Sequence, residues 1–348
     1  MKKIRIKICG YDEKDEFSYG YFLCNILKKY YDVELSEDPE YVFYTEPSSE
    51  YLKYDCVRIF FTGENISPNF NLCDYAVGFD YMSFGDRYYR LPLFLVAVFY
   101  SKKEIEMAGD LDFVAPVPFT KKELEQKTVF CSFVYSNYLS DGERKTFFEK
   151  LSAYKKVDAG GGYLNNVGGR VVNKLEFESK HKFSIAFENS SRAGYTTEKI
   201  INSLAARTIP IYWGDPGIGK ELNEKRFINC HAYESFDQVV ERVKEIDNDD
   251  DLYLSIINEP VTIKGYDFKR ERAGFEDFLR HIIEQPFELA KRRTINPARM
   301  REIEKCELII AEYTQRKTNR KKFLAKLYKP FKKIKFLEEL KHAYFAKK

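Results

Sequence analysis

The chain has 348 residues, enough for about two domains on the usual size range, and 44% of them are hydrophobic, which is ample for folded cores. Its net charge of +3 is unevenly distributed: residues 317–348 hold 12 basic and 2 acidic residues, a net charge of +10, so the rest of the chain carries −7. An acidic body argues against a nucleic-acid-binding protein, and the basic end is a separate electrostatic feature.

The seven cysteines are scattered along the chain and form no CxxC pair. An odd number without paired spacing indicates reduced thiols in a cytosolic protein and no zinc site. The first apolar stretch, 4–8, is interrupted by Arg5 and Lys7 and leads into no longer apolar run, so no secretory signal is expected. The longest apolar run, 91–100, is too short to span a bilayer.

The first 120 residues alternate short apolar runs with helical patterns, which is typical of one α/β domain of Rossmann type. Strands are expected at 4–8, 41–44, 57–61 and 74–79. A helix is expected at 19–31, and an aromatic and basic loop at 84–90.

Glu64 follows the strand expected at 57–61, at the carboxyl edge where ligands bind in parallel sheets. The turn formers Gly63, Asn65 and Pro68 also explain the chain reversal there without any function. The spacing alone therefore favours a solvent-exposed turn glutamate over a catalytic one.

The charged stretch 121–127 lacks apolar periodicity and places the domain boundary near residue 120. The second domain is expected to open with a strand at 128–134, whose carboxyl-end loop contains Ser136 and Asn137.

A helix expected at 143–151 carries Arg144 in its first turn. A basic residue there opposes the helix dipole, so Arg144 either serves a ligand anion or is an ordinary surface arginine. The glycines at 160–162 and 168–169 do not form a GxGxxG pattern, and no dinucleotide site is predicted.

The most informative stretch is 183–216, which reads as a strand, a polar loop, a helix and a second strand. The strands are expected at 183–187 and 209–213, and the helix at 196–207. A helix N-terminus at the end of a parallel strand suits a phosphate group. Tyr195, Glu198 and Lys199 stand at i, i+3 and i+4 and are expected to share one helix face, where a ring, a carboxylate and an ammonium suit a nucleoside diphosphate. An ordinary capped helix with a solvated Glu–Lys pair explains the spacing equally well.

The later chain adds a short strand and several helices, expected at 227–229, and at 236–246, 252–258 and 274–284. Asp247-x-Asp249 and Asp110-x-Asp112 match the two-carboxylate metal pattern of other sugar transferases. Both pairs lie in loops without a clear buried strand before them, so no metal site is predicted.

From residue 296 the chain is expected to be helical and increasingly basic, with a break or kink at Pro330. Apolar residues recur every three to four positions between lysines after residue 317. A basic amphipathic helix fits an anionic membrane surface. A solvated tail, a helix packed on the body and attraction to nucleic acid are the alternatives.

Three segments are specific enough to suggest a family. The central one combines Phe187-Glu-Asn-Ser190, Gly194-Tyr-Thr-Thr-Glu-Lys199 and Ile209-Pro-Ile-Tyr-Trp-Gly214. The other two are Phe60–Asn65 with Ser67–Phe70 and Asp74–Phe79, and Phe133–Asn137. Together they resemble the α1,3/α1,4-fucosyltransferases of glycosyltransferase family 10 over about residues 4–290. The leucine-containing heptad repeats of some bacterial members are absent, so a repeat-driven dimer is not expected.

The resemblance implies a GT-B architecture, in which two Rossmann-like α/β domains face a cleft. It assigns residues 1–120 to an acceptor-binding domain, 121–295 to a GDP-fucose-binding domain and 296–348 to a helical, basic tail. The implied activity is inverting transfer of L-fucose from GDP-β-L-fucose to an N-acetylglucosamine hydroxyl of N-acetyllactosamine-type glycans, giving a Lewis x-type product by single displacement.

The resemblance also implies roles for individual residues. Glu64 matches the general base, and Arg144 matches an arginine that contacts the diphosphate. The remaining matches lie in the donor-binding region: Ser136, Asn137, Asn189, Tyr195, Glu198 and Lys199. Glu198 would either hold hydroxyls or stabilise positive charge at the reacting carbon.

No cofactor is expected to be required, and a divalent metal would act only as an activator. The expected partners are GDP-fucose, an acceptor with N-acetyllactosamine or a similar glycan, and an anionic membrane surface bound through residues 317–348, with no nucleic acid. The expected location is cytoplasmic and peripheral on the inner face of a bacterial membrane. The alternatives are a GT-B transferase using another nucleotide sugar or forming an α1,4 linkage, and a non-catalytic membrane-associated binding protein.

Overall fold

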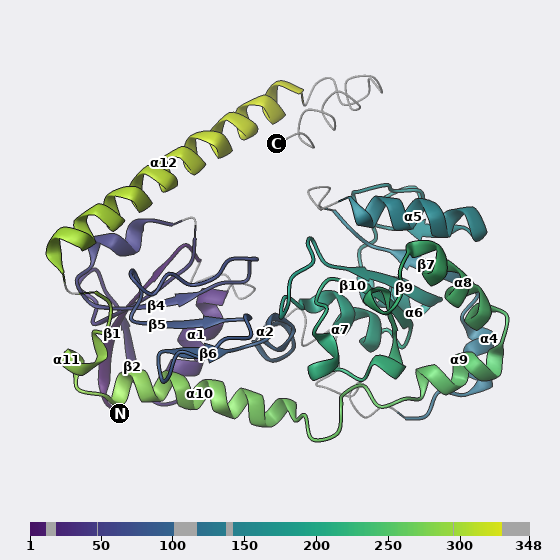
Figure 1. Ribbon diagram of the computed structural model, residues 1–348, viewed down its shortest axis with the longest axis horizontal. Coiled ribbons are helices and arrows are strands. Elements are labelled where there is room, and N and C mark those ends of the chain that lie inside the picture. The colour runs from purple at the N-terminus through teal and green to yellow at the C-terminus, as the bar shows by residue number, and fades with distance from the viewer. Residues whose placement is uncertain (12–18, 47, 101–116, 137–141, 295, 329–348) are drawn as a thin grey trace.

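The computed structural model contains two α/β domains, each built around a parallel sheet (Figure 1). It describes residues 1–11, 19–46, 48–100, 117–136, 142–294 and 296–328. The expected pair of α/β domains is therefore confirmed.

The first sheet has the strand order β2-β1-β3-β4-β5-β6, and every neighbouring pair is parallel. Its strands are β1 (Lys3–Cys9), β2 (Asp32–Leu35), β3 (Tyr41–Tyr44), β4 (Val57–Phe61), β5 (Tyr75–Gly78) and β6 (Tyr88–Arg90). β3, β4 and β5 are buried along their whole length, as central parallel strands with both faces covered should be. The prediction of a loop at 84–90 is wrong for residues 88–90, which form β6 and pair with β5.

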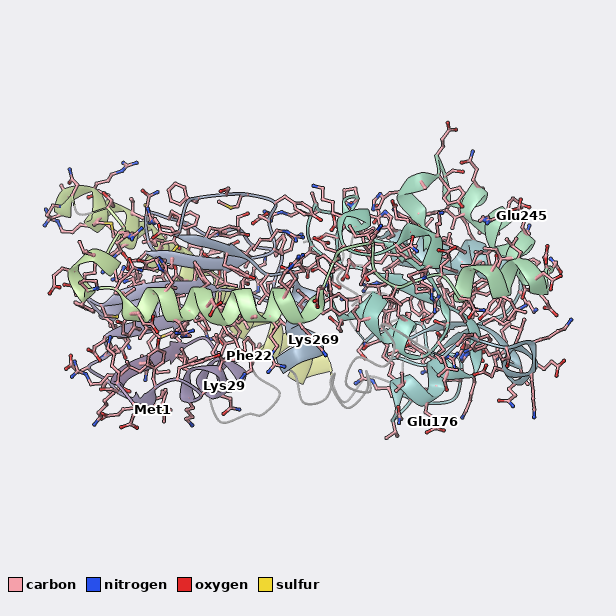
Figure 2. The ribbon with its side chains drawn as sticks, turned by 90° about the horizontal axis from the view of Figure 1, so that it is seen from below. Met1, Phe22, Lys29, Glu176, Glu245 and Lys269 are labelled. Carbon is pink, nitrogen blue, oxygen red and sulfur yellow. The ribbon has the colours of Figure 1, made fainter. Side chains whose placement is uncertain are left out.

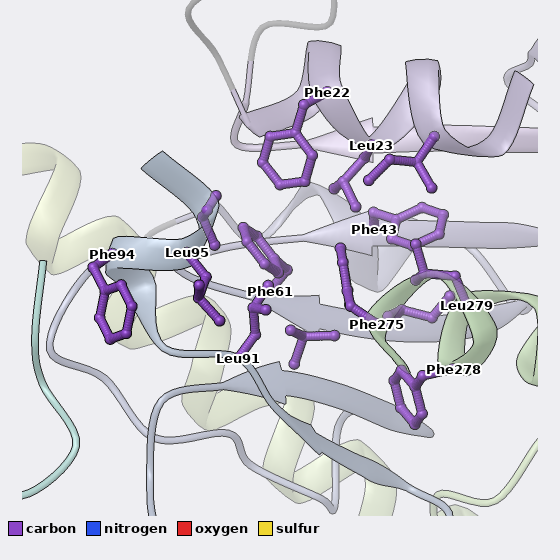
Figure 3. Packing of buried hydrophobic residues seen from close by; sticks show 14 of the residues in the cluster. Phe22, Leu23, Phe43, Phe61, Leu91, Phe94, Leu95, Phe275, Phe278 and Leu279 are labelled. Carbon is purple, nitrogen blue, oxygen red and sulfur yellow. The ribbon is translucent and has the colours of Figure 1, made fainter. Parts of the chain in front are cut away.

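One face of the first sheet is covered by helices from distant parts of the chain. These are α1 (Tyr19–Lys28), α2 (Leu93–Tyr100) and α10 (Phe268–Glu284). Figure 3 shows Phe22 of α1 and Phe275 of α10 packed around Phe43 and Phe61 of the sheet. Successive side chains of β3 point to opposite faces of the sheet. Phe43 therefore belongs to the core under these helices, whereas Val42 and Tyr44 belong to a separate apolar cluster on the other face.

The second sheet has the order β11-β10-β9-β7-β8 and is also parallel throughout. Its strands are β7 (Val129–Phe133), β8 (Val157–Ala159), β9 (His181–Phe187), β10 (Ile209–Trp213) and β11 (Ile228–Asn229). Around it lie α4 (Lys121–Gln126), α5 (Glu143–Tyr154), α6 (Lys174–Ser179), α7 (Glu198–Ala205), α8 (Phe236–Asp247) and α9 (Asp250–Ile257). The charged stretch at the expected boundary forms α4, because Thr120 and Glu123 make a capping box and Leu124 is buried.

Helix α10 returns from the second domain to the first, although the sequence-based division kept residues up to 295 in the second. Its apolar stripe, which includes Phe275, Leu279 and Ile282, joins the core of the first sheet. Seen from below, α10 runs across the first domain beside Lys29 (Figure 2), whose Nζ lies 2.7 Å from Glu276 Oε1. The chain therefore crosses between the domains twice, which ties them together.

After the short α11 (Phe287–Ala290), the chain ends in the long helix α12 (Pro297–Tyr328), which confirms the helix expected from residue 296 as far as residue 328. Its first turns are attached to the first domain through Met300 and Ile303 and through an ion pair of 2.9 Å between Glu304 and Arg58. Figure 1 shows the rest of α12 extending above that domain. The expected break at Pro330 lies outside the described residues. None of the described helices is both long and apolar enough to cross a bilayer.

Candidate functional site

The carboxyl-end loops of the two sheets meet where parallel sheets bind ligands. Asn65, after β4, donates from Nδ2 to Ser190 Oγ at 2.6 Å, and Arg192 donates to Asn65 Oδ1 at 2.9 Å. Arg192 also forms an ion pair with Asp80, which follows β5. The loop between β9 and α7 is thus joined to two loops of the first domain, and this junction holds the residue after Glu64 against the residue after Asn189.

Gly194 brings the β9–α7 loop against the first domain. It has a φ of +86°, and a Cβ there would overlap the carbonyl oxygen of Phe79. The next residue, Tyr195, packs edge-on against the Phe79 ring with centroids 5.2 Å apart. Only glycine satisfies both the left-handed conformation and the close backbone approach.

Substitution of Gly194 with alanine is expected to lower the free energy of unfolding by about 1–3 kcal/mol, because the added carbon strains the loop and separates the domains. The measurement is chemical denaturation of both proteins. Gly168 is a matched control, since it has the same φ of +86° but nothing within 4 Å of its missing Cβ. Equal losses for Gly168→Ala and Gly194→Ala would assign the effect to backbone strain alone.

Tyr195 does not share a helix face with Glu198 and Lys199, so that prediction is wrong. Helix α7 begins at Glu198, after the N-cap Thr197, and Tyr195 lies in the preceding loop. Its side chain is 2% exposed and clusters with Phe79 and Leu93 of the first domain. Tyr195 therefore stabilises the domain junction through its contacts with the first domain.

Lys199 is engaged by a residue that the sequence analysis did not assign to the site. Glu188, fully buried at the end of β9, lies 2.9 Å from Lys199 Nζ. Glu188 also accepts hydrogen bonds from the backbone N–H and the hydroxyl of Thr197, at 2.8 Å and 2.7 Å. The carboxylate thus occupies the N-terminus of α7, the position where a phosphate was expected. A polar residue directly after an apolar strand was the available signal for Glu188.

The charges around Lys199 keep this group ionised. Burial lowers the pKa of Lys199, but Glu188 and Glu198 outweigh burial and hold the pKa above its ordinary value. Loss of hydration raises the pKa of Glu198, but Lys199, Lys174 and hydrogen bonds together lower it to about 2. Glu198 keeps 36% of its side chain exposed and Lys199 14%, so both remain within reach of a ligand.

Arg144 occupies a neighbouring cradle in the same domain, and its hydrogen-bond acceptors belong to the residues on either side of Glu188. It is 1% exposed in the first turn of α5 and donates from Nη2 to Phe187 O at 2.9 Å and to Asn189 Oδ1 at 3.0 Å. Its guanidinium lies 4.0 Å from the centroid of the Tyr135 ring. The alternative of an ordinary surface arginine is therefore wrong, and the structure brings Arg144 and Asn189 together.

Tyr135 is a second residue that the sequence analysis missed. Its hydroxyl donates to Ile185 O and accepts from Phe187 N, both at 2.7 Å, so it links the ends of β7 and β9. A Cβ on Gly161 would overlap the Tyr135 carbonyl, which explains a glycine in the loop after β8. Ser136 is exposed beside this cradle, whereas Asn137 lies outside the described residues.

Glu64 is exposed at the carboxyl end of β4, and its backbone N–H donates to Thr62 Oγ1 at 3.0 Å. It lines a cavity of about 590 Å³ in the first domain. Its carboxylate is near enough to Tyr195 to contribute to the raised pKa of that phenol, after burial and the charge of Glu188. The structure thus places Glu64 on the first-domain side of the junction.

The described residues contain no group of three His, Cys, Asp or Glu side chains arranged to hold a metal ion. Asp247 instead pairs with Lys155 and Lys182 at 3.0 Å and 2.9 Å, and Asp249 caps helix α9. Asp110 and Asp112 lie outside the described residues.

Comparison with known proteins assigns the family. A profile for the N-terminal domain of the α-(1,3)-fucosyltransferase FucT matches residues 9–100, and one for the C-terminal part of glycosyltransferase family 10 (fucosyltransferase) matches 124–263. A solved α1,3-fucosyltransferase with GDP is 31% identical and has a TM-score of 0.64, over 80% of this chain and 91% of that one. This chain belongs to glycosyltransferase family 10. Its two parallel-sheet domains and this neighbour confirm the GT-B architecture.

Two further proteins to which the chain is similar are also named as fucosyltransferases. The α-(1,3)-fucosyltransferase FucT of Helicobacter pylori is 34% identical over 307 residues, which are 78% of this chain and 62% of that protein. A human 4-galactosyl-N-acetylglucosaminide 3-α-L-fucosyltransferase is 30% identical over 149 residues, or 42% of this chain and 39% of the human protein. The chain therefore spans less than two thirds of the length of these two relatives.

Proposed function

We propose that this family 10 chain is an inverting α1,3-fucosyltransferase, which transfers L-fucose from GDP-β-L-fucose to an N-acetylglucosamine hydroxyl of N-acetyllactosamine-type glycans. The observation that carries the proposal is the junction between the domains, where Asn65 Nδ2 donates a hydrogen bond to Ser190 Oγ. Ser190 lies in the loop between β9 and α7, called here the donor-side loop, and the contact sets Glu64 opposite this loop. It is supported by the solved α1,3-fucosyltransferase that binds GDP-fucose, 29% identical with a TM-score of 0.65.

The reaction proposed is a single displacement. The acceptor hydroxyl attacks the anomeric carbon of fucose from the face opposite GDP, and Glu64 takes the hydroxyl proton as the new bond forms. A positioned general base of this kind contributes about 10²–10⁴-fold to a rate. The bond between fucose and the β-phosphate breaks, and GDP leaves with the electron pair, so the configuration is inverted.

Negative charge that grows on the leaving diphosphate needs fixed positive partners. Arg144 is rigidly held by Asn189 and Tyr135, which suits a planar, two-pronged phosphate donor. Lys199 supplies a second cation, although Glu188 already balances part of its charge. Glu198, ionised at neutral pH, either accepts hydrogen bonds from donor hydroxyls or stabilises positive charge at the reacting carbon.

The test is transfer of labelled fucose from GDP-fucose to N-acetyllactosamine and to lacto-N-biose, with EDTA or Mn²⁺ present. We expect transfer to N-acetyllactosamine, and the linkage is read from the product by NMR. A parallel panel of GDP-mannose and UDP-galactose checks the donor. Transfer from another donor only, or an α1,4 product only, would overturn the proposed donor or linkage. Binding of GDP-fucose without transfer to any glycan would favour a non-catalytic binding protein.

We also propose that the basic tail attaches the protein to an anionic membrane surface. Residues 317–348 have a net charge of +10, and α12 leaves Ile309, Tyr313 and Phe323 more than half exposed. Each basic residue near an anionic surface contributes about 1 kcal/mol to binding. The membrane concerned would be the inner face of a bacterial membrane, as expected above.

Deletion of residues 317–348 is expected to preserve fucose transfer and to abolish binding to phosphatidylglycerol-containing vesicles, because it removes the net charge of +10. Co-sedimentation with vesicles measures the binding. Purely zwitterionic vesicles serve as the control and should bind neither form. Equal sedimentation of the full-length and truncated proteins with anionic vesicles would contradict the membrane proposal.

A further inference from the structure

The cavity that contains Glu64 is bounded by two segments far apart in the sequence. Its volume of about 590 Å³ falls within the range of about 300–1,000 Å³ that is usual for ligand sites. It is lined by Glu46, Tyr51 and Glu64 from the first domain, and by Glu307, Ile310 and Thr314 from α12. We propose that this cavity binds a neutral sugar of the acceptor and that helix α12 forms its outer wall, an inference that rests on the proposed fucosyltransferase function.

The wall formed by α12 is held in a defined place. Ile303 packs on the apolar cluster of the first sheet, and Glu304 pairs with Arg58, which is only 4% exposed. Glu307 follows Ile303 by four residues, and Ile310 and Thr314 continue at intervals of three and four. This spacing places all of them on one helix face. The anchored turn therefore directs the next two turns of the same face to the cavity.

The lining of the cavity suits a neutral polyhydroxyl ligand. Glu46 and Glu307 provide carboxylate oxygens that accept hydrogen bonds from sugar hydroxyls, and Ile310 offers an apolar surface to a sugar ring. No lysine or arginine is among the described residues that line it. Burial raises the pKa of Glu307, and burial together with the charge of Glu307 raises that of Glu46. An anionic sugar would face like charge with no cation to offset it.

The position of the cavity matches what the transfer reaction needs. Glu64 lines it, so a sugar bound there can present a hydroxyl to the proposed base. Asn65 also lines it and is hydrogen-bonded to Ser190 of the donor-side loop. The cavity therefore adjoins the domain junction without including the Arg144 or Lys199 groups, and acceptor binding can be altered separately from donor binding.

The first test is the steady-state kinetics of Glu307→Ala with N-acetyllactosamine and GDP-fucose. Loss of a hydrogen bond to a charged group is expected to raise the acceptor KM about tenfold or more, while the KM for GDP-fucose is unchanged. Glu302→Ala is the matched control, because Glu302 is an exposed glutamate on the same helix outside the cavity. An acceptor KM for Glu307→Ala equal to that of Glu302→Ala would overturn the inference.

The second test uses a variant that is expected to gain activity on a new acceptor, a result that misfolding would not produce. Glu307→Lys is expected to raise the kcat/KM for sialylated N-acetyllactosamine relative to the neutral disaccharide, because it adds a cation to the cavity. An unchanged ratio would overturn the neutral-sugar assignment. Slow hydrolysis of GDP-fucose without an acceptor is measured for the wild-type protein and for Glu302→Ala. If wild type neither hydrolyses nor transfers fucose, the proposed function itself fails, which distinguishes that result from failure of the acceptor assignment.

Discussion

Replacement of Glu64 with alanine is expected to lower kcat for fucose transfer by about 10²–10⁴-fold, because the acceptor hydroxyl loses the base that takes its proton. The affinity for GDP should stay at the wild-type value, since Glu64 lies in the first domain, whereas Arg144 and Lys199, the proposed partners of the diphosphate, lie in the second. Single-turnover kinetics and calorimetry with GDP measure the two quantities.

Glu64→Gln is the control for shape, because it keeps the size of the side chain and one acceptor oxygen but cannot take a proton. We expect it to be as slow as Glu64→Ala. If the glutamine variant retains the wild-type kcat, Glu64 positions the acceptor and is not the base. If both variants retain it, Glu64 has no role in the chemical step.

Replacement of Lys199 with methionine is expected to have two separable effects. It leaves the fully buried Glu188 without its cation, and breaking a buried ion pair costs about 3–5 kcal/mol of the free energy of unfolding. It also removes a charged donor to the diphosphate, so the affinity for GDP should fall about tenfold to a hundredfold. Chemical denaturation measures the first effect, and calorimetry with GDP measures the second.

The double variant Glu188→Gln/Lys199→Met separates these effects. It removes the stranded carboxylate charge and should recover most of the lost stability, while the affinity for GDP stays low. Recovery of the GDP affinity together with the stability would show that Lys199 acts only through Glu188 and does not contact the phosphates.

The central βαβ unit and most strands were predictable because their signals are local. Phe183–Phe187 and Ile209–Trp213 are apolar runs closed by turn residues, and they form neighbouring parallel strands as expected. The expected position of Glu64 at a strand end was also correct, because strand direction alone places a following residue at the carboxyl edge. The short strands β2, β6 and β8 were missed, since their pairing partners, not their own composition, make them strands.

Tertiary structure decided what the polar residues of the site do. The sequence placed Lys199 at a helix start, but only the fold brings the Glu188 carboxylate to that same end, where it competes with a phosphate. Spacing also assigned Tyr195 to the helix face, whereas packing against Phe79 of the other domain buries it. Contacts of this kind join residues that no periodicity relates, so local patterns do not reveal them.

The C-terminal helices show the same difference between local signals and tertiary contacts. Composition identified the long C-terminal helix and its charge, because both are properties of consecutive residues. Whether α10 covers the first or the second sheet, and whether α12 borders the cavity at Glu64, depends on where the chain crosses between domains. The sequence by itself determined the family signature, the α/β class and the strand-end positions, which are local. Only the folded chain decided which charges are paired and which surfaces meet, because burial and ion pairing depend on neighbours distant in the sequence.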